Sequence, residues 1–249
     1  MILLKNQQQI QLMREANQVV KQTLQLLCEN CKPGVSTYEL NKLAHDFIIK
    51  CGAKPSFLNY CGYPASVCIS IDDEVVHGIP SKKRFIEEGQ IVSFDVGAIL
   101  KGWHGDAART VAVGYVDDQK QKLMEVTKQA FFEGVNSIVI GKTTIGDLGH
   151  TIQTYAESFG YGVVKELVGH GIGRQMHEDP SVPNYGTKGH GMKLVEGMTI
   201  AVEPMINAGT DKVIFMPDGW TVKTLDGKPS AHYENTIALT KNGVEILSL

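Results

Sequence analysis

The sequence has no surplus of positive charge and no long hydrophobic run. Its 24 lysines and arginines stand against 27 acidic residues, which gives a net charge of −3 and an isoelectric point near 6.2. Nucleic-acid and anionic-membrane binding depend on a basic surplus or a basic stripe. The N-terminal residues turn polar at Lys5, too soon for a signal-peptide core, and no later apolar run approaches the length of a membrane span. We therefore expect no nucleic-acid partner, no membrane association and a cytoplasmic location.

Cysteine is scarce and odd in number, with five in the chain. Without a secretory signal, this indicates free thiols in a reducing compartment. Cys28 and Cys31 have the spacing of a redox or zinc-binding pair, but the chain lacks a second pair for zinc and a preceding strand for a thioredoxin-like motif. We interpret this pair as incidental.

The chain also lacks a linker or low-complexity segment that would divide it. It has 249 residues and a mass of 27.3 kDa, with 43% hydrophobic and 20% charged residues. These values are typical of one soluble globular α/β domain. We predict a single domain over residues 1–249.

What the sequence does contain is one motif set that occurs twice. A histidine and two acids follow one another as His77, Asp95 and Asp106 in the first half and as His170, Glu203 and Glu234 in the second. Four landmarks share one offset of 108 residues (203 − 95): Leu40 and Leu148, Gly52 and Gly160, Gly89 and Gly197, Asp95 and Glu203. Generic placement of glycine and acid at strand ends does not explain a fixed offset. We predict two related halves, approximately 34–114 and 141–240, packed into one unit.

Helical patterns precede the strands in each half. Periodic apolar residues predict a helix over 7–28, and a capping-box pattern at Ser36 and Glu39 predicts a second helix that ends at Cys51-Gly52. In the second half we predict helices near 120–138 and from about 143 to 160. The order helix, helix, strands therefore recurs.

The acids lie in β-rich runs. A hairpin centred on Leu100 and Lys101 would place Asp95 directly opposite Asp106. Such acids could also point outward on half-exposed strands. Buried carboxylates are costly without compensation, however, and like charges at close range raise each other's pKa. Four of them in one place predict two divalent cations, about 3.5–4 Å apart as in two-metal hydrolytic sites.

The histidines extend this set. His170 lies between Gly169 and Gly171, which would let the backbone come close to a ligand. A phosphate cradle is the alternative for this glycine-rich run, but it lacks the strand and helix that such a motif needs. Oxygen ligands with one imidazole suit Mn, Fe, Co or Zn in an open catalytic site. His77 and His177 would remain free to act on substrate.

Together these motifs resemble methionine aminopeptidases. The resemblance rests on Val-His77-Gly-Ile-Pro, on Asp95 eleven residues before the Asp106 of His-Gly-Asp, on Gly-His170-Gly-Ile-Gly with Met-His177-Glu-Asp-Pro, and on Val-Glu203-Pro-Met and Tyr-Glu234-Asn-Thr. It extends over essentially the whole chain. Only 31 positions (234 − 203) separate Glu203 from Glu234, so the sequence is similar to the compact bacterial type I form and leaves no room for the type II insertion.

The resemblance implies a pita-bread α/β fold, with two pseudo-twofold-related halves around a curved antiparallel sheet. It also implies that two divalent cations (Co, Mn, Fe or Zn) are held by Asp95, Asp106, His170, Glu203 and Glu234, with Asp106 and Glu234 bridging. Glu203 would take the proton of a water activated by the two cations, and His77 and His177 would contact the scissile amide. The methionine pocket would be formed by Tyr60, Tyr63, Cys68, Met176 and Trp220.

The chain departs from the family pattern at two pocket positions. Met176 stands where the family often has phenylalanine, and Cys61 where it often has histidine, which puts substrate tolerance in doubt. By the resemblance, Asp72 and Ser230 fall near a monovalent-cation site seen in some members. We expect structural or supporting roles for the remaining histidines, which are His45, His104, His150, His190 and His232.

By this resemblance, the chain removes the N-terminal methionine of nascent polypeptides with a small second residue. It would act as a monomer, with the ribosome as a possible partner. A prolidase or Xaa-Pro aminopeptidase shares the five ligands, but such enzymes usually carry a long N-terminal domain before the catalytic one. A non-catalytic relative that binds nascent chains is a further alternative, although such relatives tend to lose ligands.

Overall fold

A computed structural model describes residues 2–249. The helices are α1 (Gln7–Asn30), α2 (Thr37–Lys50), α3 (Asp118–Asn136) and α4 (Ile145–Glu157), with one short 3₁₀ turn, η1 (Tyr60–Gly62). The strands are β1 (Lys54–Pro55), β2 (Cys68–Ile71), β3 (Glu74–Val76), β4 (Ile91–Leu100), β5 (Trp103–Ala112), β6 (Gly162–Val163), β7 (Gly169–Gly171), β8 (Glu178–Val182), β9 (Thr199–Val202), β10 (Met205–Asn207), β11 (Val213–Phe215), β12 (Val222–Thr224), β13 (Ser230–His232), β14 (Glu234–Thr240) and β15 (Gly243–Ile246). Within the described chain, no helix is both long and apolar enough to cross a membrane.

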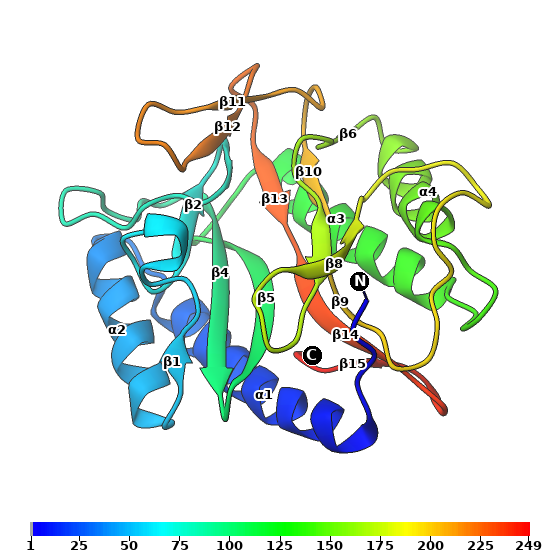
Figure 1. The fold of residues 1–249 in the computed structure, drawn as a ribbon. Helices are drawn as coiled ribbons and strands as arrows, with labels where there is room; N and C mark the ends of the chain where they lie inside the picture. Colours follow the sequence, from blue (N-terminus) through cyan, green and yellow to red (C-terminus); the bar gives the residue numbers. More distant parts are fainter. Residues whose placement is uncertain (1) are drawn as a thin grey trace.

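One curved antiparallel sheet runs through the centre of the molecule (Figure 1). Its strands follow the order β1-β4-β5-β14-β9-β7-β8, with β2 added beside β4 and β15 beside β14. Helices α1 and α2 lie beside the half that contains β4 and β5, whereas α3 and α4 lie beside the other half. The contact between β5 and β14 joins the two halves, so residues near this junction come from both.

The four predicted helices are present, and their starts follow from local chemistry. At α2, the Ser36 hydroxyl accepts a hydrogen bond from the Glu39 backbone N–H, and the Glu39 carboxylate accepts one from the Ser36 N–H. Thr144 and Asp147 make the same reciprocal pair at α4. Each pair satisfies backbone donors that a helix start leaves without partners. Helix α1 extends two residues beyond the predicted 7–28, and Asn6 caps it in the same way.

The structure repeats local features at the 108-residue offset. Strands β4 and β9 begin at Ile91 and Thr199, and isolated β-bridges join Ser36 to Phe85 and Thr144 to Lys193. The offset ends after β9. Asp106 and Glu234 are 128 residues apart (234 − 106), and the added length holds the β11–β12 hairpin.

The predicted register of the β4–β5 hairpin is wrong. The turn is formed by Lys101 and Gly102, at φ 53° and 77°, so Asp95 pairs with Ala108 and Asp106 pairs with Gly97. A two-residue turn with both φ angles positive matches the right-handed twist of the strands. Because side chains alternate between faces, positions 95 and 97 share a face, and Asp95 and Asp106 are diagonal neighbours on it. Diagonal partners are about 7–8 Å apart, which leaves more room between the two carboxylates.

Each half has its own apolar core. In the first half, Leu27, Ile69 and Phe94 are fully buried among residues of α1, α2, β2 and β4. In the second, Phe131 and Leu148 are buried among residues of α3, α4 and β9. The two cores hold the junction of β5 and β14 rigidly between them, because close-packed interiors resist deformation.

Replacement of Gly105 tests how closely α1 packs on β5. A Cβ atom at this position would lie 2.8 Å from the Asn17 backbone nitrogen and 2.9 Å from the Ala16 carbonyl carbon. Helix backbone cannot move aside as a flexible side chain does, so we expect Gly105→Ala to lower the free energy of unfolding by about 1–3 kcal/mol. Urea denaturation measures this change. Gln129→Ala, on the exposed face of α3, is the control, and its free energy of unfolding should stay within about 0.5 kcal/mol of that of the parent protein. A Gly105→Ala protein as stable as the parent would contradict the packing described.

Candidate active site

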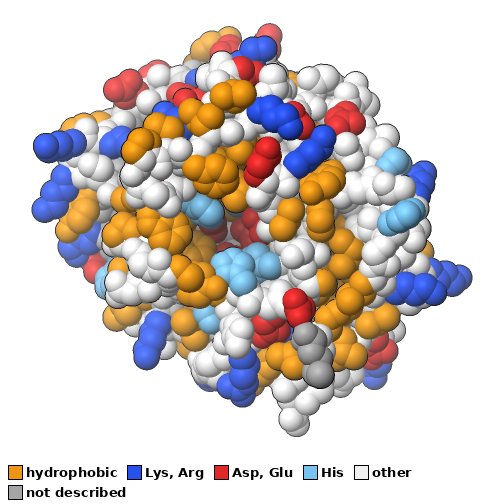
Figure 2. Space-filling view, turned by 45° about the horizontal axis from the view of Figure 1, so that its top comes forward, with side chains coloured by type: hydrophobic (Ala, Val, Ile, Leu, Met, Phe, Trp, Pro, Cys, Tyr) orange, Lys and Arg blue, Asp and Glu red, His pale blue; other side chains and the backbone are white. Residues whose placement is uncertain are grey.

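One pocket of about 290 Å³ brings together all twelve residues for which the sequence predicted a site role. Its walls also include Phe57 and Cys61. In Figure 2 a hollow opens near the centre of the face shown. Histidine side chains (pale blue) lie at its edge, and acidic side chains (red) are visible deeper inside, between them. The twelve residues are Tyr60, Tyr63, Cys68, His77, Asp95, Asp106, His170, Met176, His177, Glu203, Trp220 and Glu234.

The four acids reach the pocket from four strands of the central sheet. Asp95 lies on β4, Asp106 on β5, Glu234 at the start of β14, and Glu203 directly after β9. Asp106 and Glu234 are only 3% and 2% exposed. Ligand atoms of Asp106, Glu234 and His170 all lie within 4.8 Å of one another, so a single cation could contact all three.

Burial shifts the pKa of every acid upward, and repulsion adds to the shift of three of them. Burial raises the pKa of Asp95 to about 7. Burial raises the pKa of Asp106, Glu203 and Glu234 as well, and the neighbouring carboxylates add to each shift. Among residues 2–249, Asp95 Oδ1, Asp106 Oδ1 and Glu234 Oε1 are buried without a hydrogen-bond partner. Buried oxygen atoms of this kind are costly unless a cation binds them, so the donor set fits hard divalent cations.

His170 is oriented as a ligand. Its Nδ1 lies 2.9 Å from the Gly171 carbonyl oxygen, which can only accept, so Nδ1 carries the proton. Its Nε2 lies 3.6 Å from Asp106 Oδ2 and 3.7 Å from Glu203 Oε1. Burial lowers the pKa of His170 to about 3, so the ring is neutral at physiological pH and Nε2 offers a lone pair.

The glycines beside His170 serve packing rather than approach to a ligand, contrary to our expectation. A Cβ at Gly169 would lie 2.3 Å from the Ala201 carbonyl oxygen, and one at Gly171 would lie 2.1 Å from the Asp179 carbonyl oxygen. These oxygens belong to the neighbouring strands β9 and β8. The segment is itself strand β7, not a loop that opens a helix, so the structure gives no support to a phosphate cradle.

Two further histidines face the pocket from its outer side. His77 has the left-handed backbone angle φ 61°, and burial lowers the pKa of its ring to about 4. Burial also lowers the pKa of His177, whose Nδ1 lies 2.7 Å from the Tyr60 hydroxyl oxygen. Both rings are therefore neutral at pH 7, and each has one N–H. The His177 N–H can donate to substrate, whereas the His77 ring hydrogen-bonds the Trp220 backbone.

The remaining wall is apolar and aromatic. The Tyr63 ring packs edge-on against Trp220, with centroids 5.1 Å apart, and Cys68 and Met176 are buried beside them. Phe57 also lines this wall, a position that the sequence analysis missed. No motif surrounds Phe57; only its placement beside β4, where its ring would meet a Cβ at Gly97 at 2.8 Å, brings it to the pocket.

The other histidines lie outside this pocket. His232 Nε2 is 3.7 Å from Glu203 Oε2 and 3.9 Å from Glu234 Oε2, so it lies directly behind the acids. His104 contacts the Ser56 hydroxyl at 3.0 Å. Near the surface, His45 contacts Ser66, His150 contacts the Gly186 carbonyl, and His190 is exposed.

Two more predicted features have plain structural surroundings. The Asp72 carboxylate forms an ion pair with Lys120 at 2.6 Å, and its backbone carbonyl accepts from the Ser230 N–H.

Cys28 and Cys31 are free thiols, and burial raises their pKa to about 11 and about 12. Thiols with raised pKa are poor nucleophiles, which agrees with an incidental pair.

The raised pKa of Asp95 predicts how the metal-free protein responds to pH. The folded carboxyl, with its pKa near 7, keeps a proton that an unfolded chain loses near pH 4. Its contribution therefore lowers stability as pH rises from about 4 to 7. After metal removal, we expect Asp95→Asn, which cannot ionise, to raise the free energy of unfolding at pH 8. The gain is about 1.4 kcal/mol for each unit by which the folded pKa of Asp95 exceeds its unfolded pKa. At pH 4 the substitution should change the free energy of unfolding little.

Urea denaturation in the presence of EDTA measures this difference. The exposed Asp46→Asn is the matched control and should show no such pH-dependent gain. An Asp95→Asn protein no more stable than the parent at pH 8 would contradict the burial described.

Comparisons with known proteins identify the family of the chain. Residues 11–241 match metallopeptidase family M24. A methionine aminopeptidase of Clostridium acetobutylicum is 55% identical over 249 residues, covering 100% of this chain and 99% of that protein. The crystal structure of methionine aminopeptidase from Rickettsia prowazekii superposes with a TM-score of 0.97 at 44% identity, covering 100% of both chains.

The rival family shares the fold but not the length. Prolidase from Pyrococcus furiosus has a TM-score of 0.79 at 24% identity, and the match covers 99% of this chain but 65% of that one. At that identity the likeness shows the fold alone. The methionine aminopeptidases named above have much higher identity and full coverage. Together with the family match, they confirm the predicted pita-bread fold and the use of divalent metal. The chain belongs to metallopeptidase family M24 and, within it, to the methionine aminopeptidases of type I.

Proposed function

We propose that this chain removes the N-terminal methionine from polypeptides whose second residue is small. The observation that carries the proposal is one pocket with two buried carboxylates, two half-buried carboxylates and a neutral histidine on one side and a soft apolar wall on the other. The first set suits metal-assisted hydrolysis, and the second suits a thioether side chain. The curated relatives are named for the same activity.

Five residues would hold two divalent cations, namely Asp95, Asp106, His170, Glu203 and Glu234. Ligand atoms of Asp106, Glu234 and His170 lie within 4.8 Å of one another, so these three could hold the same cation. When bound, such cations supply Lewis acidity and lower the pKa of a water toward neutrality. The oxygen-rich donor set accommodates Co, Mn, Fe or Zn.

Glu203 is the proposed proton carrier. Its two carboxylate oxygens lie 3.7 Å from His170 Nε2 and 3.7 Å from His232 Nε2, and the Asn184 amide donates to its backbone carbonyl. Burial and the neighbouring acids raise the pKa of Glu203, so its carboxylate is a stronger base than an ordinary glutamate. It would accept a proton from the attacking water and deliver it to the leaving amine.

His77 and His177 would act on the scissile amide. In His177, the Tyr60 hydroxyl can donate to Nδ1, which leaves the proton on Nε2 and directs an N–H toward substrate. Preorganised donors of this kind stabilise the oxygen on which negative charge develops. Neutral rings donate without adding charge to the metal site.

The apolar wall would hold the methionine side chain. Tyr63 and Trp220 supply rigid aromatic surfaces, and Cys68 and Met176 supply polarisable sulfur. Met176 has more rotatable bonds than the phenylalanine frequent in the family, so this wall adapts more readily to altered side chains. We propose that the protein acts as a monomer in the cytoplasm, on chains that emerge from the ribosome.

Replacement of the proposed base tests the mechanism. We expect Glu203→Gln to lower kcat on a Met-Ala-Ser peptide by at least about 100-fold, because the amide cannot accept the proton. KM should change little, since the methionine pocket is intact. Metal content measured on the same sample separates loss of base from loss of metal. Glu29→Gln, an exposed change on α1, is the control, and full activity of Glu203→Gln would exclude the assigned role.

A comparison of substrates tests the activity itself. With Co, Mn or Fe present, the protein should release methionine from Met-Ala-Ser and leave an Xaa-Pro dipeptide uncut, as liquid chromatography of the products would show. Cleavage of Xaa-Pro but not Met-Ala would instead assign a prolidase activity. Binding of Met-Ala-Ser without turnover in the metal-loaded protein would favour the non-catalytic alternative.

A further inference from the structure

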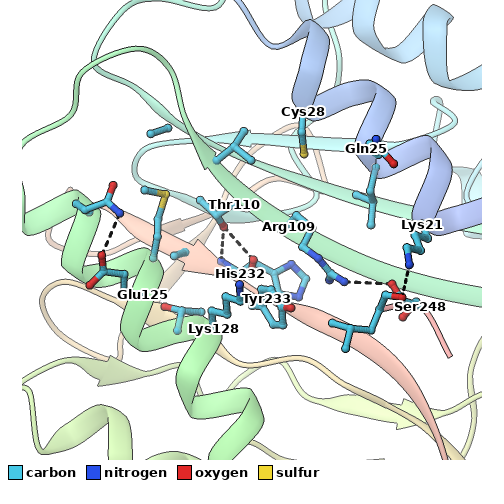
Figure 3. A pocket seen from close by; sticks show the side chains of 18 residues that line it. Lys21, Gln25, Cys28, Arg109, Thr110, Glu125, Lys128, His232, Tyr233 and Ser248 are labelled. Atoms are coloured by element: carbon cyan, nitrogen blue, oxygen red, sulfur yellow. Dashed lines mark hydrogen bonds between the residues drawn. The ribbon is translucent and has the colours of Figure 1, made fainter. Parts of the chain in front are cut away.

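A second cavity, of about 700 Å³, lies between α1 and α3 (Figure 3). Strand β5 and residues 231–233 form its floor, and residues 248 and 249 close one side. It shares no lining residue with the pocket described above. The proposed function does not use it.

The floor of this cavity carries the positive charge of Arg109, which forms no direct ion pair with the described residues, although the Glu234 carboxylate interacts with it electrostatically. The Arg109 guanidinium donates to four neutral oxygens: Ala108 O at 2.8 Å, Glu234 O at 2.5 Å, Asn235 Oδ1 at 2.6 Å and Ser248 O at 3.2 Å. It also stacks on the Tyr233 ring at 4.4 Å. Among residues 2–249, no carboxylate lies within ion-pair distance of it. A partly desolvated cation without an anion is unfavourable, so a bound anion would stabilise this arrangement.

The walls add to the positive charge. Figure 3 shows Arg109 between Lys21 of α1 and Lys128 of α3. Glu125 is the one acidic side chain among the described lining residues, and it contacts Gln121 and Lys122 on its own helix. The Lys21 ammonium donates to the Leu249 carbonyl oxygen at 2.6 Å. Three basic side chains therefore face one acid.

The cavity also has an apolar part, beside uncharged polar residues such as Gln25 and Thr127. Leu24 lines it from α1, Met124 from α3 and Val111 from β5, and the Tyr233 ring lies beside them. A small inorganic anion would leave these side chains uncovered, whereas an organic anion could bury its apolar part against them. Apolar surface with a few convergent polar groups is the usual composition of a small-molecule site.

We propose that this cavity binds a small organic anion. Its carboxylate or phosphate would pair with Lys21, with Lys128 and with the Nε–H of Arg109, which donates to none of the four oxygens above. Its apolar or aromatic part would lie against Leu24 and Met124. The site is distinct from the metal cluster, although both contact strand β14 at Glu234, whose backbone carbonyl accepts from Arg109.

Isothermal titration calorimetry with three probes tests the proposal: 4-phenylbutyrate, phenyl phosphate and the neutral 4-phenylbutyramide. We expect both anions to bind and the amide to bind at least about tenfold more weakly, because it makes no charge-assisted hydrogen bond. Titrations are run on Mn²⁺-loaded protein and again after EDTA treatment. The relative strength of the two anions identifies the preferred acid group.

Matched variants locate the site. Arg109→Gln should weaken anion binding at least about tenfold and Lys128→Gln several-fold, whereas Lys122→Gln on the exposed face of α3 should leave it unchanged. A second readout does not depend on any substitution. The anion should slow alkylation of Cys28, which lines the cavity, and not that of Cys51, which does not, as measured by mass spectrometry. If Arg109→Gln does not fold, the alkylation of Cys28 and the affinity of Lys128→Gln test whether the anion binds in this cavity.

Three outcomes would overturn the proposal. Binding that disappears after EDTA would place the anion on the catalytic metals. Binding of the amide as tightly as the acids would show that charge plays no part. Unchanged Cys28 alkylation, with unchanged affinity in Lys128→Gln, would place the anion elsewhere.

Discussion

The carboxylates of Asp95, Asp106, Glu203 and Glu234 line one pocket, where lost hydration raises the pKa of each and repulsion between the acids adds to the shift of the last three. Removing one proton from this cluster makes removal of the next more difficult. Bound divalent cations would make the loss of these protons easier, because they would replace the lost hydration and attract all four negative charges. The sheet holds the acids together at a cost in stability, and metal binding offsets this cost.

The architecture keeps these acids at fixed positions. They come from four strands of one hydrogen-bonded sheet, with an apolar core behind each half. The repeated offset aligns Asp95 with Glu203, but their surroundings differ. Glu203 has His170 and His232 beside its two oxygens, whereas Asp95 Oδ1 is buried without a hydrogen-bond partner among the described residues. The β11–β12 hairpin is present only in the second half, and the loop between its two strands contains Trp220 of the pocket wall. The halves are alike in scaffold and different in chemistry.

Much of this arrangement could be predicted from sequence because local rules dictate it. Capping pairs such as Ser36 and Glu39 specify helix starts, and acids inside apolar runs point to a shared charged site. The centre of the hairpin turn was predicted one residue too early, at Leu100 and Lys101, so the predicted partner of Asp95 differs by two positions from its actual partner, Ala108. Phe57 and Arg109 were missed for another reason. Their roles come from tertiary neighbours on distant segments, and neither lies in a pattern that spacing could reveal.

The central claim is that the clustered acids can all be ionised together at neutral pH only when divalent cations balance their charge. Calorimetric titration of Mn²⁺ into the metal-free protein at pH 7, repeated in buffers of different ionisation enthalpy, counts both the cations bound and the protons released. Two cations per chain, with release of at least one proton as the raised pKa values fall, is the result that the account predicts. Binding of fewer than two cations without release of any proton would contradict it.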